Sequence, residues 1–101
     1  MEQLKPILIE VLRGYAVKGF NGRGYLMSDS AETVFAVIDI GQVRGKTVAD
    51  ASLIVRLIDD QIIIDRDLND KILLDALLQA GIPRHQIVLT YADETPAIAQ
   101  P

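Results

Sequence analysis

Six aspartates lie close together in the second half of the chain, and carboxylates often hold Mg²⁺ or carry protons in hydrolysis. They are Asp59, Asp60, Asp65, Asp67, Asp70 and Asp75. Metal-dependent nucleases often place an Asp on one strand before an acidic-x-Lys motif on the next strand. Residues 65–67 read Asp-Arg-Asp and lack that lysine. We therefore expect turn and helix-start roles for these side chains, with a metal-dependent nuclease using the carboxylates of residues 59–67 as an alternative.

Other residues that could do chemistry are few. The chain has no cysteine, and its one histidine, His85, has no nearby residues at metal-binding spacing. The glycines of residues 19–24 (GFNGRG) follow a predicted helix and precede no Lys-Ser/Thr signature, so they do not match a phosphate-binding loop. We predict no catalytic residue, no metal and no cofactor, and therefore a protein that is not an enzyme.

Charge and hydropathy favour protein binding over direct DNA binding. Ten Lys and Arg residues stand against fourteen Asp and Glu residues, which gives a net charge of -4. Proteins that hold DNA directly rely on a basic surface to neutralise its phosphates. Half of the residues are apolar and the mean hydropathy is +0.24, which is high for a small soluble domain. We therefore expect a homo-oligomer or a partner interface that covers the surplus.

The chain is predicted to be one domain spanning residues 1–101. Its first residues are not the basic and apolar segment of a secretory signal. No apolar run approaches the roughly 20 residues that a membrane span needs. The lack of cysteine fits a reducing compartment. We expect a cytoplasmic protein without a membrane segment.

The first half is predicted to fold as a helix followed by two strands. Apolar residues recur at helical spacing over residues 2–17, as in an amphipathic helix. Residues 24–28 predict a short strand. The β-branched run 33–39 predicts a central strand that is covered on both faces. Glycines and charged residues then predict a loop over residues 41–46.

The second half begins with a predicted pair of strands. Apolar and polar residues alternate over residues 51–58, which is the period of a strand with one buried face. Asp59 and Asp60 form a candidate turn. Residues 61–66 then predict the return strand, with Ile62 and Ile64 on one face.

A second helix and a last strand complete the predicted order. Asn69 is the expected N-cap of this helix, and Gly81 is expected to close it in the left-handed conformation. Residues 87–91 predict the final strand, and residues 92–101 an irregular C-terminal tail. The predicted class is α+β: an N-terminal helix, a four-stranded antiparallel meander, a second helix and a final strand, with both helices on one face of the sheet.

Residues 59–91 resemble the C-terminal half of the XisI family, the fdxN-element excision controlling factors. The shared features are a helix that closes in Gly-Ile-Pro-Arg at residues 81–84 and an Ile-Val-Leu strand ending in the aromatic Tyr91. An N-terminal helix ending in Tyr15 also has a family equivalent. The chain departs from many members at residues 40–43 (IGQV), because it lacks their Gly-Trp pair.

The resemblance implies a cyanobacterial-type accessory protein. It would act with a site-specific recombinase and an XisH-like, endonuclease-like companion to control the excision of a DNA element, and it carries over no catalytic residue. A small-molecule sensor with an apolar cavity beneath the helices is a further alternative. We predict the partner interface at the last helix-to-strand connection and the edge of the final strand. This interface consists of Ile82, Pro83, Arg84, His85 and Tyr91.

Overall fold

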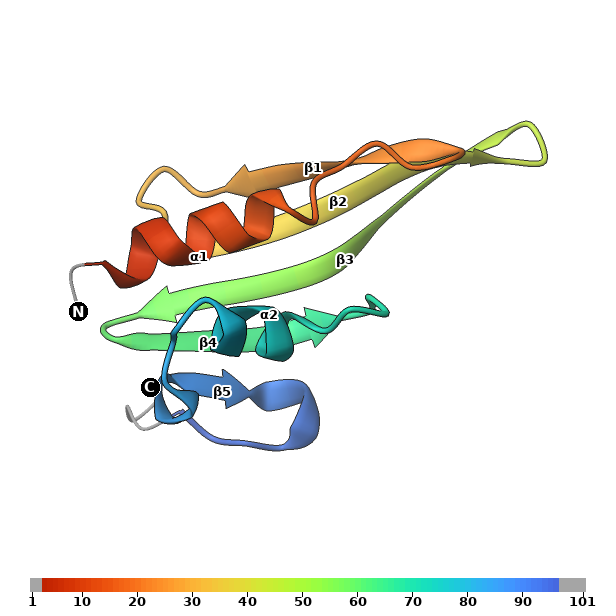
Figure 1. Ribbon diagram of the computed structural model, residues 1–101. Helices are drawn as coiled ribbons and strands as arrows, with labels where there is room; N and C mark the ends of the chain where they lie inside the picture. Colours follow the sequence, from red (N-terminus) through yellow and green to blue (C-terminus); the bar gives the residue numbers. More distant parts are fainter. Residues whose placement is uncertain (1–2, 97–101) are drawn as a thin grey trace.

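The computed structural model describes residues 3–96, and these residues form an elongated molecule of 45 × 28 × 27 Å (Figure 1). Its elements are α1 (Leu4–Arg13), β1 (Gly22–Ser28), β2 (Val34–Val43), β3 (Lys46–Ile58), β4 (Gln61–Asp67), α2 (Leu73–Gln79) and β5 (Ile87–Leu89). Two 3₁₀ turns, η1 (Arg84–Gln86) and η2 (Thr90–Ala92), flank β5. Within residues 3–96, no helix is long and apolar enough to cross a membrane.

All five strands form one sheet in the order β1-β2-β3-β4-β5. The first four strands pair antiparallel with their sequence neighbours, which confirms the predicted meander. β5 instead pairs parallel with β4, with Ile62 opposite Ile87. This direction follows from α2, because a helical crossover returns the chain to the starting end of β4. The predicted α+β class is confirmed, and Figure 1 shows both helices on the same side of the sheet.

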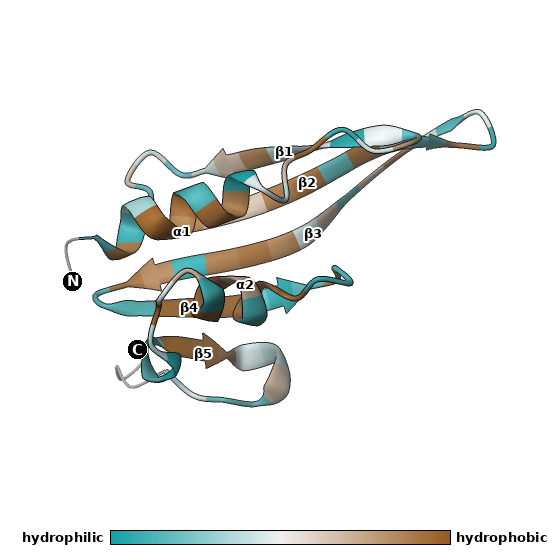
Figure 2. Ribbon diagram, in the orientation of Figure 1, coloured by the Kyte–Doolittle hydropathy of each residue, from teal (hydrophilic) through white to brown (hydrophobic). Residues whose placement is uncertain are grey.

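One aliphatic core lies between the two helices and the sheet. Leu4, Leu8 and Leu12 recur every fourth position along α1 and are fully buried. The other members of the cluster are Phe35, Val37, Leu53, Val55, Leu57, Ile62, Ile64, Leu73, Leu77, Ile82, Ile87 and Leu89. Figure 2 shows the strands as largely hydrophobic along this region. The alternation predicted for β3 and for Ile62 and Ile64 is therefore confirmed.

β2 is not covered on both faces, so this prediction was wrong. Phe35 and Val37 belong to the core, whereas Val34, on the other side of the strand, is 40% exposed. Both helices occupy one face of the sheet, and they leave the opposite face of β2 without a helix over it (Figure 1). The β-branched run thus reflects a preference for strand geometry rather than burial on both sides.

β2 and β3 continue beyond the helices, where the sequence predicted a loop, and past Gly41 they form a two-stranded ribbon because β1 pairs with β2 only up to this residue. We call residues 39–50 the arm; it comprises the end of β2, a turn and the start of β3. Arg44 and Gly45 have φ values of 53° and 78°, and a type I′ hairpin turn needs positive φ at both central residues. Every arm residue except Gly41 is exposed. Figure 1 shows the arm projecting past α1 and α2.

The start of α2 differs from its prediction. The helix begins at Leu73, and Asn69 is not its N-cap. The backbone N–H of Leu73 instead donates to the carboxylate of Asp67 at 2.6 Å. Asp67 ends β4, so its carboxylate reaches the first turn of α2 from the sheet.

The ends of α1 and β5 differ from their predictions, whereas the end of α2 agrees. α1 stops at Arg13 rather than at residue 17, and residue 2 lies outside the described residues. Gly81 closes α2 with φ 95°, as predicted, and the N–H of Ile82 donates to the carbonyl of Leu77 at 3.0 Å. β5 ends at Leu89 instead of residue 91, because the chain turns into η2.

Candidate functional site

Asp65 and Asp67, the central carboxylates of the predicted acidic cluster, stabilise the fold through hydrogen bonds. Asp65 is the extra residue of a bulge in β4, and it accepts hydrogen bonds of 2.6 and 3.0 Å from Arg56 and another from the Thr90 hydroxyl. Asp67 accepts from the backbone N–H and the side-chain amide of Asn69, both at 3.0 Å. These bonds tie β4 to β3, to η2 and to the loop before α2.

The other aspartates do not build a metal site with them. Asp59 forms the hairpin turn with φ 52°, which agrees with its predicted turn role. Asp70 precedes α2, and Asp75 lies in its first turn. In the part of the chain that the structure describes, no three His, Cys, Asp or Glu side chains are grouped so that they could hold a metal ion.

Acid is expected to weaken the fold through carboxylates whose pKa lies below its ordinary value. Burial alone would raise the pKa of Asp65, but its hydrogen bonds to Arg56 and Thr90 and the charge of Arg56 lower it below 3.8. Backbone and side-chain hydrogen bonds also lower the pKa of Asp29 and of Glu94. A carboxylate with a depressed folded-state pKa contributes stability above its unfolded pKa of about 4 and loses it as pH falls through the folded value.

We therefore predict that Asp65→Asn lowers the free energy of unfolding by about 1 kcal/mol at pH 7, as the loss of a half-buried ion pair would. Between about pH 5 and pH 2 the difference from the wild type should shrink, because the wild type loses the same interaction there. Urea titrations at several pH values measure this. A difference that stays constant over the whole range would contradict the assignment.

Of the five residues of the predicted partner interface, one is buried and the others lie before and after β5. Ile82 is 2% exposed and belongs to the core, so it cannot contact a partner. Pro83 is half-buried, and His85 is exposed on η1 before β5. Tyr91 is 47% exposed on η2 after β5, at the opposite end of that strand. Pro83 and His85 thus lie before β5 and Tyr91 after it, and the partner interface stays a prediction.

Arg84 and the outer edge of β5 are already occupied by the segment that follows η2. Arg84 donates to the carbonyl of Ile87 at 2.7 Å and to the carboxylate of Glu94 at 2.6 Å. Glu94 in turn accepts from the N–H of Leu89 at 2.9 Å, and its own N–H donates to the carbonyl of Leu89 at 3.0 Å. This end of β5 therefore offers no free edge at Leu89. Of the predicted tail, residues 97–101 lie outside the described residues.

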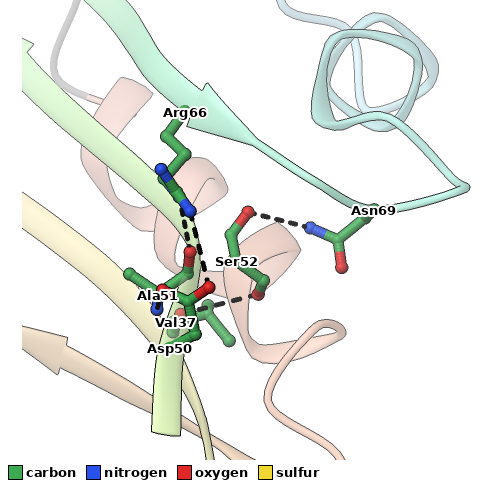
Figure 3. A network of polar contacts seen from close by, with 6 residues as sticks. All are labelled: Val37, Asp50, Ala51, Ser52, Arg66 and Asn69. Carbon is green, nitrogen blue, oxygen red and sulfur yellow. Dashed lines mark hydrogen bonds and ion pairs between the residues drawn. The ribbon is translucent and has the colours of Figure 1, made fainter.

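A polar network forms the joint between the arm and the helix-covered sheet (Figure 3). Ser52 is the extra residue of a bulge in β3, and its hydroxyl donates to the carbonyl of Val37 at 3.5 Å. Arg66 donates to the carbonyl of Ala51 at 2.7 Å, and Asn69 donates to the carbonyl of Ser52 at 3.4 Å. The end of β4 and the following loop thus hold the bulge at which the arm begins.

The joint opens onto a surface hollow that sequence reasoning did not predict. It has a volume of about 450 Å³ and lies beside the arm, rather than beneath the helices as the sensor alternative required. Phe20 is 100% exposed at its rim, and Val17, Val43 and Val48 contribute apolar walls. The glycines around Phe20 were the available signal, because they predicted a turn. An apolar residue type gave no reason to expect full exposure.

Two carboxylates and one phenol supply polar groups around this hollow. Asp39 and Asp50 face each other across β2 and β3. The carboxylate of Asp50 lies 3.5 Å from Arg66, whereas that of Asp39 has no hydrogen-bond or ion-pair partner among residues 3–96. Tyr15 donates its hydroxyl proton to the carbonyl of Lys71 at 2.8 Å. Burial, followed by the charges of Asp67 and Asp75, raises the pKa of Tyr15, so the phenol stays neutral. The hollow is therefore apolar with an acidic margin.

Comparisons with known proteins agree with the fold. Two crystal structures from Anabaena variabilis are similar to the chain, each at 20% sequence identity. An XisI-like protein matches with a TM-score of 0.64 over 87% of this chain and 80% of its own. The fdxN element excision controlling factor XisI matches with a TM-score of 0.68 over 89% of this chain and 90% of its own. No curated protein matches the chain.

A family comparison identifies the chain more specifically than these structures do. The profile of the family described as XisI protein matches residues 1–97, which is nearly the whole sequence. The match includes residues 59–91 and the N-terminal helix, which carry the resemblance in the sequence, and it also includes the arm. The chain therefore belongs to the XisI family.

Proposed function

We propose that this chain is a non-catalytic accessory protein that controls the excision of a DNA element by site-specific recombination. The observation that carries the proposal is the match of residues 1–97 to the XisI family. One similar crystal structure is that of an fdxN element excision controlling factor. The chain would act by binding an XisH-like, endonuclease-like companion, which would supply the contacts with DNA.

The charges and contacts of the chain support a protein-binding role. Its net charge of -4 disfavours direct contact with a phosphate backbone. Asp65 and Asp67, the best placed carboxylates for metal-dependent chemistry, are engaged in hydrogen bonds that hold β4, η2 and α2 together. Several large apolar side chains stay exposed on the described surface, including Phe20, Val43 and Tyr91. Exposed apolar groups of this kind are typical of interaction surfaces.

The excision role can be tested with a reporter in which removal of the DNA element restores a gene. The reporter, the recombinase and the XisH-like companion are expressed together, with or without the chain. We expect excision to depend on the chain severalfold. The double variant Asp60→Asn/Asp65→Asn should support excision to the extent that it stays folded, because the proposed role does not use these carboxylates in catalysis. Excision that is the same with and without the chain would refute the role in control.

Binding to the companion is measured separately by pull-down. The wild type should retain the companion, and Tyr91→Ala should retain less of it, because Tyr91 is the exposed aromatic residue of the predicted interface. Met27→Ala is the matched control, because Met27 is also half-exposed but lies on β1, far along the sheet from β5. A companion that is not retained at any salt concentration would exclude the proposed partner.

A further inference from the structure

Phe20 and the arm form an apolar surface that nothing in the described chain covers. Phe20 is fully exposed, although its turn is well held: the N–H of Gly19 donates to the carbonyl of Gly22 at 2.8 Å, and the carbonyl of Asn21 accepts from Gln42 at 2.9 Å. Val17, Val43 and Val48 around it are each about half-exposed, at 55%, 54% and 48%. An ordered turn that presents a large aromatic to solvent is typical of an interface.

The arm also needs support from outside. Residues 42–50 are all exposed and have no helix over either face (Figure 1). β1 pairs with β2 as far as Gly41, so the arm beyond this residue is a ribbon of two strands only. A ribbon of two strands is at best marginally stable in water unless a further surface packs on it. A partner that covers the face with Val43 and Val48 would supply this surface.

The charges on that face identify the partner. On β3, the face of the arm that includes Val48 also carries Lys46 near the tip and Asp50 near the base, because alternate residues of a strand lie on one face. Asp39 lies directly opposite Asp50, and two like charges at a cross-strand pair are unfavourable. Arg66 lies 3.5 Å from Asp50, whereas Asp39 has no ion-pair partner among residues 3–96, so a cation from outside would relieve the remaining repulsion at Asp39. Lys46 is such a cation, but on the same copy it lies at the other end of the face.

A second copy placed antiparallel brings these charges together. If a two-fold axis passes between two arms at Val48, each Lys46 lies over Asp39 and Asp50 of the other copy, and the two Val48 side chains meet at the axis. The basic, apolar and acidic side chains of Lys46, Val48 and Asp50 thus match the same series on a second copy that runs in the opposite direction. An isologous interface requires this self-complementarity. Phe20, at the edge of the hollow, would pack into the corresponding hollow of the other copy.

The exposed area is sufficient for such a dimer. Phe20 and the three half-exposed valines present about 400 Å² of apolar surface per copy. Since about 60% of a typical interface is apolar, two copies would bury about 1,300 Å² in total. Stable interfaces bury about 1,200–2,000 Å².

We propose that the chain forms a two-fold symmetric dimer through the arm and Phe20, with Lys46 of each copy paired with Asp39 and Asp50 of the other. This inference stands apart from the proposed function, because it concerns a second copy and not the companion. It places the self-association that the composition predicted on a defined surface.

A charge exchange tests the arrangement. Sedimentation of the purified chain should show a dimer. Lys46→Glu and Asp39→Lys should each raise the dimer dissociation constant on the order of tenfold, since each places like charges in contact. The double variant Lys46→Glu/Asp39→Lys should return it to within about threefold of the wild type. Lys71→Glu has the same change in net charge away from the arm and is the control that should leave the dimer intact.

The apolar part is tested with variants of two exposed residues. Phe20→Ser should raise the dissociation constant at least ~30-fold, as expected for an aromatic anchor that fills a hollow of the other copy, and circular dichroism should show an unchanged fold. Met27→Ser removes a side chain that is 56% exposed on the helix-free face and should not change the dimer. The proposal is overturned if the wild type is monomeric at every concentration, if Lys46→Glu behaves as Lys71→Glu does, or if Met27→Ser dissociates the dimer and Phe20→Ser does not.

Discussion

Asp67→Ala is expected to lower the free energy of unfolding by about 2–3 kcal/mol, because the replacement leaves several donors without an acceptor. One carboxylate oxygen accepts from the backbone and the side chain of Asn69, both at 3.0 Å, and the other accepts from the N–H of Leu73 at 2.6 Å. Leu73 is buried in the first turn of α2, so losing this bond loosens the helix start as well as the loop. Urea or thermal unfolding measures the change, with a fall in Tm of roughly 8–24 °C.

Three further variants separate the role of Asp67 from that of charge alone. Asp67→Asn keeps one acceptor oxygen and should cost about half as much. Asp70→Ala removes a nearby exposed carboxylate and should stay within about 0.5 kcal/mol of the wild type. Asn69→Ala should cost less than Asp67→Ala, because Asn69 does not cap α2. An effect of Asn69→Ala larger than that of Asp67→Ala would contradict the capping of α2 by Asp67.

The start of α2 shows why local sequence signals locate the region where a helix begins but not the residue that caps it. Asn69 and Asp67 both have side chains suited to capping, and the sequence favoured Asn69 because it stands directly before a helical pattern. The outcome depends on where β4 ends relative to α2, which is a tertiary property. The end of the same helix was predictable, since Gly81 and Pro83 act through their own backbone. Local signals thus sufficed where no distant group competed.

The arm and Phe20 are the parts of the candidate site that could not be predicted from the sequence. The alternation of residues 51–58 predicted β3 correctly because one face packs against the helices. Residues 41–46 contain glycines and charges, which are typical of loops, and only the pairing of β2 with β3 makes them strand. Apolar type alone predicts burial of Phe20. Its exposure depends on Gly22 and Gly41, which let the turn lie close against β2.

Gly22→Ala is therefore expected to be strongly destabilising, by about 3 kcal/mol, at the upper end of what overpacking usually costs. A Cβ at Gly22 would meet the carbonyl oxygen of Ile40 and would lie 2.5 Å from the Cα of Gly41 and 2.9 Å from the carbonyl carbon of Ile40. All three atoms are backbone, so no side-chain rotation relieves the contact. β1 and β2 must separate where the turn with Phe20 begins, and Tm should fall by roughly 12–24 °C.

Gly19→Ala is the matched control for this effect, because it lies in the same turn. Its added Cβ would meet only the carbonyl oxygen of Gly22 at 3.7 Å, an ordinary van der Waals distance. Gly19→Ala should thus be neutral or should stabilise the chain by up to about 1 kcal/mol, since alanine restricts the unfolded chain. Thermal unfolding of both variants measures the difference. Because the same close approach holds Phe20 at the rim of the hollow, Gly22→Ala should also weaken the proposed dimer while Gly19→Ala leaves it intact. Equal melting temperatures for the two variants would show that the turn does not lie against β2 in this way.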